Sequence, residues 1–179
     1  FQQLSHPWRI LDPHTAPEKH GTLADAYRRA PGSESCAVAI NLRRLPEVLV
    51  SYFHHMQRHG QGQRFANGRP FGELCFEEYL HYVLEHPETQ TYDWILDQHL
   101  GEREADHYLR VGDLAESFLD VVGRHHEIGP EIRDRVRTIR ANVGSYERRG
   151  PTGWFRRDEM EQLYRNCPRW RRCEEAVYG

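Results

Sequence analysis

The stretch that most constrains the fold is a short apolar run, CAVAIN (residues 36–41), followed by two arginines and a helical pattern. A short, nearly continuous apolar run that follows turn residues is typical of a strand buried in a parallel sheet. After Arg43 and Arg44, Pro46 suits the first turn of a helix, and apolar residues recur at helical spacing as far as Met56. The stretch therefore predicts a buried strand, a basic turn and a helix in direct succession.

The remaining elements are predicted from periodicity and from residues that begin or end helices. Helices are expected at 22–29, 71–84, 114–123 and 157–166, the first, third and fourth with Thr22, Asp113 and Asp158 as N-caps. HYLRV (residues 107–111) predicts a second strand, whereas residues 91–100 are ambiguous and residues 131–141 fit a helix or coil. Few strands separated by helices indicate an α/β protein, a small parallel sheet flanked by helices, rather than an all-α bundle.

Composition limits the classes of protein to which the chain can belong. Its 179 residues are enough for one domain, which we expect to span residues 1–179. A net charge of −3 argues against a general nucleic-acid binder. No run approaches the roughly 18 apolar residues that a membrane span needs, so no membrane span is expected.

Arginine dominates the basic residues, with 23 Arg and a single Lys. From Glu131 to the end of the chain, twelve Arg stand against eight acidic residues, so this part is locally basic. A planar guanidinium group can donate two parallel hydrogen bonds to the oxygens of a phosphate or sulfate. The composition therefore favours an anionic ligand or partner for the C-terminal part.

Cysteine and histidine give no strong signal for a metal. The four cysteines form no CxxC pair and are expected as free thiols, with a bridge between Cys167 and Cys173 left open. His55 and His59 are four residues apart, a spacing that could suit zinc, but no acidic or Cys ligand is placed to complete the site. No metal site is therefore expected.

Two basic segments are candidates for binding an anion. Arg43 and Arg44 follow the carboxyl end of the predicted strand and precede the N-terminus of a helix, a usual place for anionic ligands. Ser51 could add a hydroxyl donor there. The alternative is a solvated arginine pair, with Ser51 bonded back to its own helix. The second segment, Arg148-Arg149-Gly150, could wrap a phosphate or could be an ordinary surface loop.

The segment RRLPEVLVSYFHHM resembles the 3′-phosphate-binding segment of sulfotransferases that use 3′-phosphoadenosine 5′-phosphosulfate (PAPS). In that family an Arg and a Ser eight residues later bind the 3′-phosphate, and Arg43 and Ser51 have this spacing. The chain departs from the family where Arg44 and Leu45 replace the usual Asn-Pro, with Pro46 one place later.

Three more segments resemble the family in the same order along the chain. PEKH contains His20, which corresponds to the family's catalytic base, and residues 107–123 resemble the strand and helix near the adenine pocket, although Gly112 replaces a Glu. YERRGPTGWFRRDEMEQLY resembles the segment that covers the 3′-phosphate. The resemblance gives that cofactor-binding role to Arg148, Arg149 and Gly150.

The family's 5′-phosphosulfate loop, with a pattern such as PKSGTT, is not found in this sequence. The resemblance therefore implies a sulfotransferase fold, similar to P-loop NTPases, that lacks its N-terminal strand, loop and helix. Because the sequence does not begin with Met, we expect it to be N-terminally incomplete.

The implied activity is transfer of a sulfuryl group from PAPS to a hydroxyl or amine of a small-molecule, lipid or carbohydrate acceptor, leaving adenosine 3′,5′-bisphosphate (PAP). We expect a cytoplasmic enzyme, or one of the Golgi lumen if an anchor precedes these residues, and a homodimer is left open. One alternative is a nucleotide-binding scaffold that kept the 3′ site without catalysis. Another is a helical module whose Arg-rich end binds an acidic partner.

Overall fold

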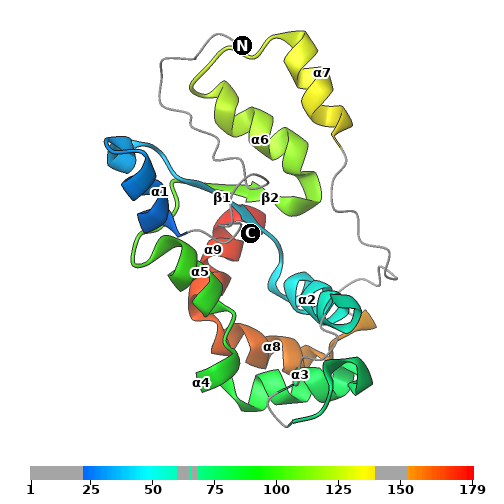
Figure 1. Cartoon of the computed structure of the whole chain (residues 1–179). Helices are drawn as coiled ribbons and strands as arrows, with labels where there is room; N and C mark the ends of the chain where they lie inside the picture. The colour runs from blue at the N-terminus through cyan, green and yellow to red at the C-terminus, as the bar shows by residue number, and fades with distance from the viewer. Residues whose placement is uncertain (1–21, 60–64, 66–67, 140–152) are drawn as a thin grey trace.

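The computed structural model describes residues 22–59, 65, 68–139 and 153–179. In this part of the chain, helices surround a two-stranded parallel sheet (Figure 1). The α/β class predicted from the sequence is therefore confirmed.

Most of the described residues are helical. The helices are α1 (Leu23–Arg29), α2 (Leu45–His59), α3 (Phe76–Glu85), α4 (Pro87–Gln90), α5 (Asp93–Leu100), α6 (Leu114–Gly123), α7 (Pro130–Thr138), α8 (Arg157–Asn166) and α9 (Pro168–Tyr178). Short 3₁₀ turns lie at η1 (Ser33–Ser35), η2 (Phe71–Glu73) and η3 (Val111–Asp113). Within these described residues, no helix is long and apolar enough to cross a membrane.

The sheet pairs β1 (Ala39–Leu42) with β2 (His107–Arg110) in parallel. Ala39 lies opposite His107 and Leu42 opposite Arg110, so both strands end at the same edge. Parallel strands need a crossover connection, and α2 to α5 supply it here.

The predicted burial of the first strand is wrong in detail. β1 begins three residues later than predicted, so Cys36 precedes it and is only half-buried. Leu42 is fully buried, whereas Ala39 and Asn41 are exposed. The reason is the size of the sheet: among the described residues β1 has a neighbouring strand on one side only, so it is not enclosed as a central strand would be.

Elements with local capping signals agree well with the structure. α1 begins with a reciprocal capping box, in which the Asp25 N–H donates to the Thr22 hydroxyl at 3.1 Å and the Asp25 carboxylate accepts from the Thr22 N–H at 2.8 Å. α8 has its predicted bounds, but Glu159 rather than Asp158 accepts the Arg156 N–H, at 2.7 Å.

Two other predictions of helix starts need correction. The helix predicted at 71–84 is divided into η2 and α3, because Cys75 adopts an extended conformation and caps α3. Asp113 precedes α6, but its side chain makes no capping hydrogen bond. The ambiguous segment 91–100 contains α5, and segment 131–141 contains most of α7.

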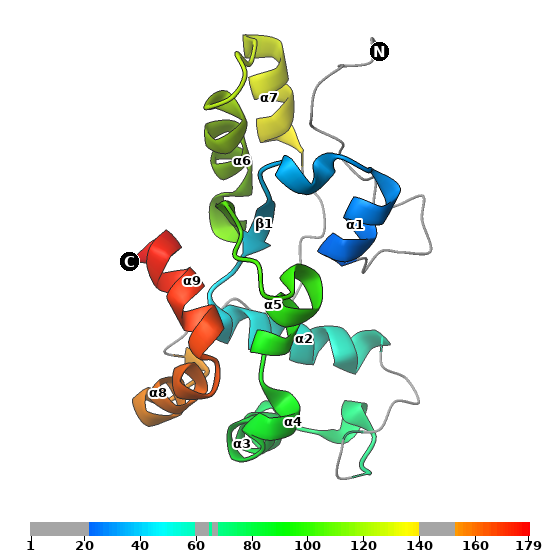
Figure 2. The ribbon, with the colours of Figure 1, turned by 90° about the vertical axis from the view of Figure 1, so that its left-hand side faces the viewer.

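The hydrophobic core lies on one side of the sheet, among α2, α3, α5, α8 and α9. Its most buried side chains include Leu49, Tyr79, Leu80 and Leu163. α6 and α7 lie on the other side of the sheet in both views (Figures 1 and 2). All four cysteines are free thiols, so the bridge left open between Cys167 and Cys173 is not formed.

Candidate functional site

The turn that carries Arg43 and Arg44 lies between the last residue of β1 and the first residue of α2. Since Leu42 pairs with Arg110, the second strand also ends at this edge. The structure thus places the two arginines at the carboxyl end of a parallel sheet, as predicted. Ligands of open α/β sheets usually bind at this end.

Arg44 is held by the C-terminal helix α9. Its guanidinium lies 3.7 Å from Glu174 Oε1 and 4.5 Å above the centre of the Tyr178 ring. Glu174 is buried, with 5% of its surface exposed, so it forms a fixed negative partner. Arg44 is therefore already engaged by carboxylate and aromatic groups of its own chain.

Arg43 has different surroundings, although it is the next residue in the chain. Within the described part of the chain, no hydrogen bond or ion pair engages its half-buried guanidinium. Its main-chain carbonyl accepts from the Trp170 indole N–H at 3.1 Å. Arg43 is thus the arginine of this pair that can offer its side chain to an anion.

The start of α2 is less available to a ligand than the sequence suggests. The Leu45 N–H donates to Glu174 Oε2 at 2.8 Å, and Pro46 has no N–H to offer. The first two residues of this helix therefore leave no N–H group for an external anion. A buried carboxylate of the same chain takes the position that an external anion would take.

Glu174 is itself fixed by a third group. The Tyr164 hydroxyl donates to Glu174 Oε1 at 2.7 Å. Burial, and next the hydrogen bond to the Glu174 carboxylate, raise the pKa of Tyr164 above its ordinary value, so its proton stays in place as a donor. This hydrogen bond fixes the carboxylate that caps α2.

Ser51 lies two turns into α2 and is partly exposed. Leu49, Val50 and Phe53 turn toward the core, so Ser51 lies beside the apolar face and not within it. Among the residues that the structure describes, its hydroxyl makes no hydrogen bond, including to the carbonyl of Glu47 one turn before. The alternative in which Ser51 is satisfied by its own helix is therefore not observed.

The other predicted site residues, His20, Arg148, Arg149 and Gly150, lie outside the described residues. The described chain resumes at Gly153, and the ring of the next residue, Trp154, lies edge-on to His54 at 5.6 Å between centres. Trp154 also contacts Phe76 at 5.1 Å. The segment that follows the Arg-Arg-Gly triplet thus packs on α2 at His54, which is three residues after Ser51.

Arg110 is a residue of this edge to which sequence reasoning gave no role. It ends β2, lies 3.6 Å from Asp113 in an ion pair, and its Nε donates to the Ser117 hydroxyl at 3.4 Å. Glu116 forms an ion pair with Arg137 at 2.6 Å. Asp113 and Glu116 thus neutralise neighbouring arginines. The pairing register of the two strands was the signal that could have placed Arg110 at the same edge as Arg43.

No role was predicted from the sequence for helix α9 either, although three of its residues contact the turn. Trp170, Glu174 and Tyr178 recur every four residues, so they share one face of the helix. The available signal for a shared role was that side chains ending in a polar group recur at regular spacing in this last helix. Nothing in the sequence indicated what this face would contact.

The histidines of α2 do not form a metal centre in the described residues, where no group of three His, Cys, Asp or Glu side chains could hold a metal ion. His54 packs instead against Phe53 and Trp154. Burial, and next the charge of Arg58, lower the pKa of His54 below 6.5.

Comparisons with protein-family models, with curated proteins and with solved structures found no match. The sulfotransferase resemblance therefore rests on the sequence motifs alone.

Proposed function

We propose that the turn between β1 and α2 binds the 3′-phosphate of PAPS, and that the chain takes part in transfer of a sulfuryl group to a hydroxyl or amine. The observation that carries the proposal is the contrast between the two arginines. Arg44 is neutralised by Glu174, whereas no described group engages Arg43, which lies at the carboxyl edge of the sheet. A guanidinium that no group in the described residues engages favours a phosphate ligand, since it can donate two hydrogen bonds to phosphate oxygens.

Two further observations support the same role. The Ser51 hydroxyl is not used by its own helix, so it can donate to the same anion. The segment after Arg148, Arg149 and Gly150 packs on α2 through Trp154, which suits a second set of donors for this anion. The proposed fold is accordingly that of the sulfotransferases.

In the proposed reaction, the acceptor oxygen or nitrogen attacks sulfur, the bond from sulfur to the bridging phosphate oxygen breaks, and the acceptor proton passes to a base, for which His20 is the candidate. PAPS supplies the activated sulfuryl group. Arg43 and Ser51 would hold the donor in place, because the 3′-phosphate takes no part in the chemistry and its binding energy serves positioning. The proposed acceptor is a small molecule, a lipid or a carbohydrate.

The binding step is tested by calorimetry with PAP and with adenosine 5′-phosphate, which lacks the 3′-phosphate. We expect PAP to bind more tightly, and Arg43→Ala to weaken PAP about tenfold or more, as for loss of a charged hydrogen-bonding partner. Arg58→Ala is the matched control, because it removes an exposed guanidinium from the far end of α2, away from the turn that carries Arg43. Equal affinities for the two nucleotides, or equal effects of the two substitutions, would refute the 3′-phosphate site.

The transfer step needs a separate measurement, since a scaffold could bind PAP without catalysis. Incubation with PAPS and a panel of phenols, alcohols and amines should release PAP at a rate that depends on the acceptor. Tight PAP binding with no acceptor-dependent release would favour the scaffold.

A further inference from the structure

We propose that Trp170, Glu174 and Tyr178 of α9 are positioning residues for Arg43, an inference that rests on the proposed 3′-phosphate site. Their spacing of four residues places them on successive turns of one helix face. Each makes a hydrogen bond to the main chain around Arg43. Together we call these three side chains the α9 clamp.

The clamp holds the peptide groups on both sides of Arg43. The Tyr178 hydroxyl donates to the Leu42 carbonyl at 2.9 Å, and the Trp170 indole N–H donates to the Arg43 carbonyl at 3.1 Å. The first carbonyl belongs to the peptide plane before the Arg43 Cα, and the second to the plane after it. Because peptide planes are rigid, fixing both of them fixes the direction of the Arg43 Cα–Cβ bond.

The third member of the clamp fixes the exit from the turn. Glu174 accepts the Leu45 N–H at 2.8 Å and therefore sets where α2 begins. The same carboxylate lies 3.7 Å from the Arg44 guanidinium and keeps that side chain on α9. One residue thus orders the turn and removes the competing arginine, which leaves Arg43 as the donor.

Helix α9 is itself anchored, which the clamp requires. The buried Asp93 carboxylate accepts from the Arg169 N–H at 2.8 Å and from the Trp170 N–H at 2.7 Å. The Arg169 guanidinium donates to Asp97 at 2.6 Å. The N-terminus of α9 is therefore fixed to α5, and the clamp holds the turn against a rigid element.

A purely structural α9 would stabilise the fold without affecting ligand choice, so the test must separate the two roles. We would measure the ratio of affinities for PAP and adenosine 5′-phosphate in Trp170→Phe and Tyr178→Phe, which keep an aromatic ring and lose the donor. We expect the ratio to fall about threefold to tenfold, the range of one hydrogen bond, with binding of adenosine 5′-phosphate unchanged.

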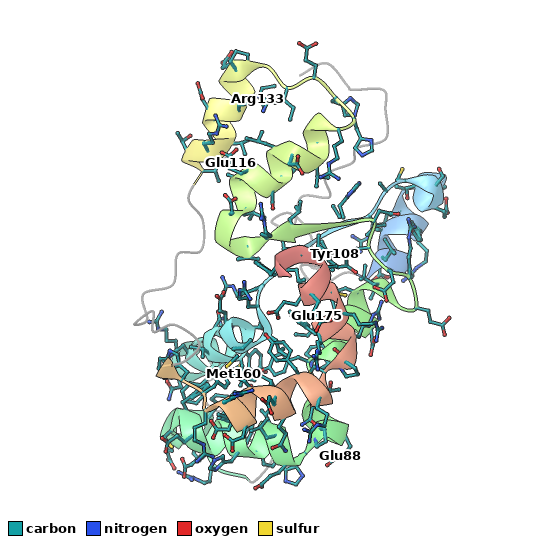
Figure 3. All side chains as sticks on the ribbon, turned by 180° about the vertical axis from the view of Figure 1, so that it is seen from behind. Glu88, Tyr108, Glu116, Arg133, Met160 and Glu175 are labelled. Carbon is teal, nitrogen blue, oxygen red and sulfur yellow. The ribbon has the colours of Figure 1, made fainter. Side chains whose placement is uncertain are left out.

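Tyr108→Phe is the matched control. Its hydroxyl, on the residue labelled in Figure 3, also contacts α9, by accepting from the Cys173 thiol at 3.2 Å. The same hydroxyl donates to Glu104 at 3.0 Å and not to the turn. This substitution removes the same atom and should leave the affinity ratio unchanged.

Hydrogen exchange gives a second readout that needs no ligand. We expect the Leu45 amide to exchange faster in Glu174→Gln and Trp170→Phe than in the unaltered chain, and not in Tyr108→Phe. Unchanged Leu45 exchange would overturn the clamp. A PAP preference that survives in Trp170→Phe and Tyr178→Phe would overturn the positioning role alone, whereas no PAP preference in the unaltered chain would overturn the proposed function and the positioning role together.

Discussion

Arg43 and Arg44 show how two identical side chains take different roles through their neighbours. They are adjacent in the chain after the end of β1, yet their side chains have different surroundings. One meets the buried carboxylate of Glu174 and the ring of Tyr178; the other meets no charged group in the described part of the chain. The contrast supports the proposal that Arg43 binds the anion, whereas Arg44 contacts groups of its own chain.

This division of roles predicts opposite effects on stability and binding. Arg44→Ala should lower the free energy of unfolding by about 1 kcal/mol, since the pair is half-exposed but its carboxylate is buried. Arg43→Ala should change it by less than about 0.5 kcal/mol, because no hydrogen bond or ion pair engages this side chain in the described part of the chain. Urea unfolding measures both values. Equal losses in the two variants would contradict the assignment.

His54 predicts a pH dependence of stability at the scale of one residue. Burial and the Arg58 charge lower its folded pKa below 6.5, so the unfolded chain binds the proton more readily. Stability should therefore be highest above about pH 6.5 and fall as the pH drops from there through the folded pKa.

The measurement is the urea midpoint at pH 7.5 and at pH 5.5. His54→Phe, which keeps a ring against Trp154, should show a smaller loss of stability at the lower pH than the unaltered chain. His55→Phe serves as the control, because this neighbouring side chain is exposed. A pH dependence that is the same in all three proteins would contradict the prediction.

At the scale of the element, α2 and α9 are each capped by a carboxylate from a distant segment. Glu174 is 129 residues from Leu45, and Asp93 is 76 residues from Arg169. Both acids are buried and both accept N–H groups at a helix N-terminus, where negative charge is favoured. These two caps join α5, α9 and α2 into one connected support for the turn.

Asp93→Asn tests the first link of this support. The substitution removes the charge and one of two acceptors, leaving a buried N–H group of α9 without a good partner. We expect a loss of about 1–3 kcal/mol in the free energy of unfolding. Asp134→Asn, on the exposed surface of α7, should cost much less. Similar losses for the two variants would show that the Asp93 cap contributes little.

The caps also explain how far the sequence could predict this molecule. Thr22 and Asp25 lie three residues apart, so their capping box can be read locally, and the same holds for the bounds of α8. The parallel strand pair was predictable from short apolar runs separated by helices. The burial of β1 was not, since it depends on how many strands join the sheet. The α9 clamp was not either, because its contacts span more than 120 residues.

At the scale of the whole molecule, the sheet separates two parts of unequal packing. The core lies with α2, α3, α5, α8 and α9, whereas α7 on the other side buries no residue. A surface ion pair joins α7 to α6, in which Arg137 binds Glu116 at 2.6 Å and 3.1 Å. Arg133 Nε donates at 3.0 Å to the carbonyl of Ile128, which lies between the two helices. Figure 3 shows Glu116 and Arg133 on these facing helices.

This asymmetry predicts local opening of α7 without unfolding of the core, because little apolar surface is exposed when it opens. Its amides should exchange faster than those of Leu49 to Phe53 in α2. Arg137→Ala should accelerate α7 exchange severalfold, and added salt should do the same in the unaltered chain by screening the exposed pair. Arg157→Ala, which removes a surface pair of α8, should leave α7 exchange unchanged. Exchange in α7 as slow as in α2 would show instead that the two sides of the sheet open together.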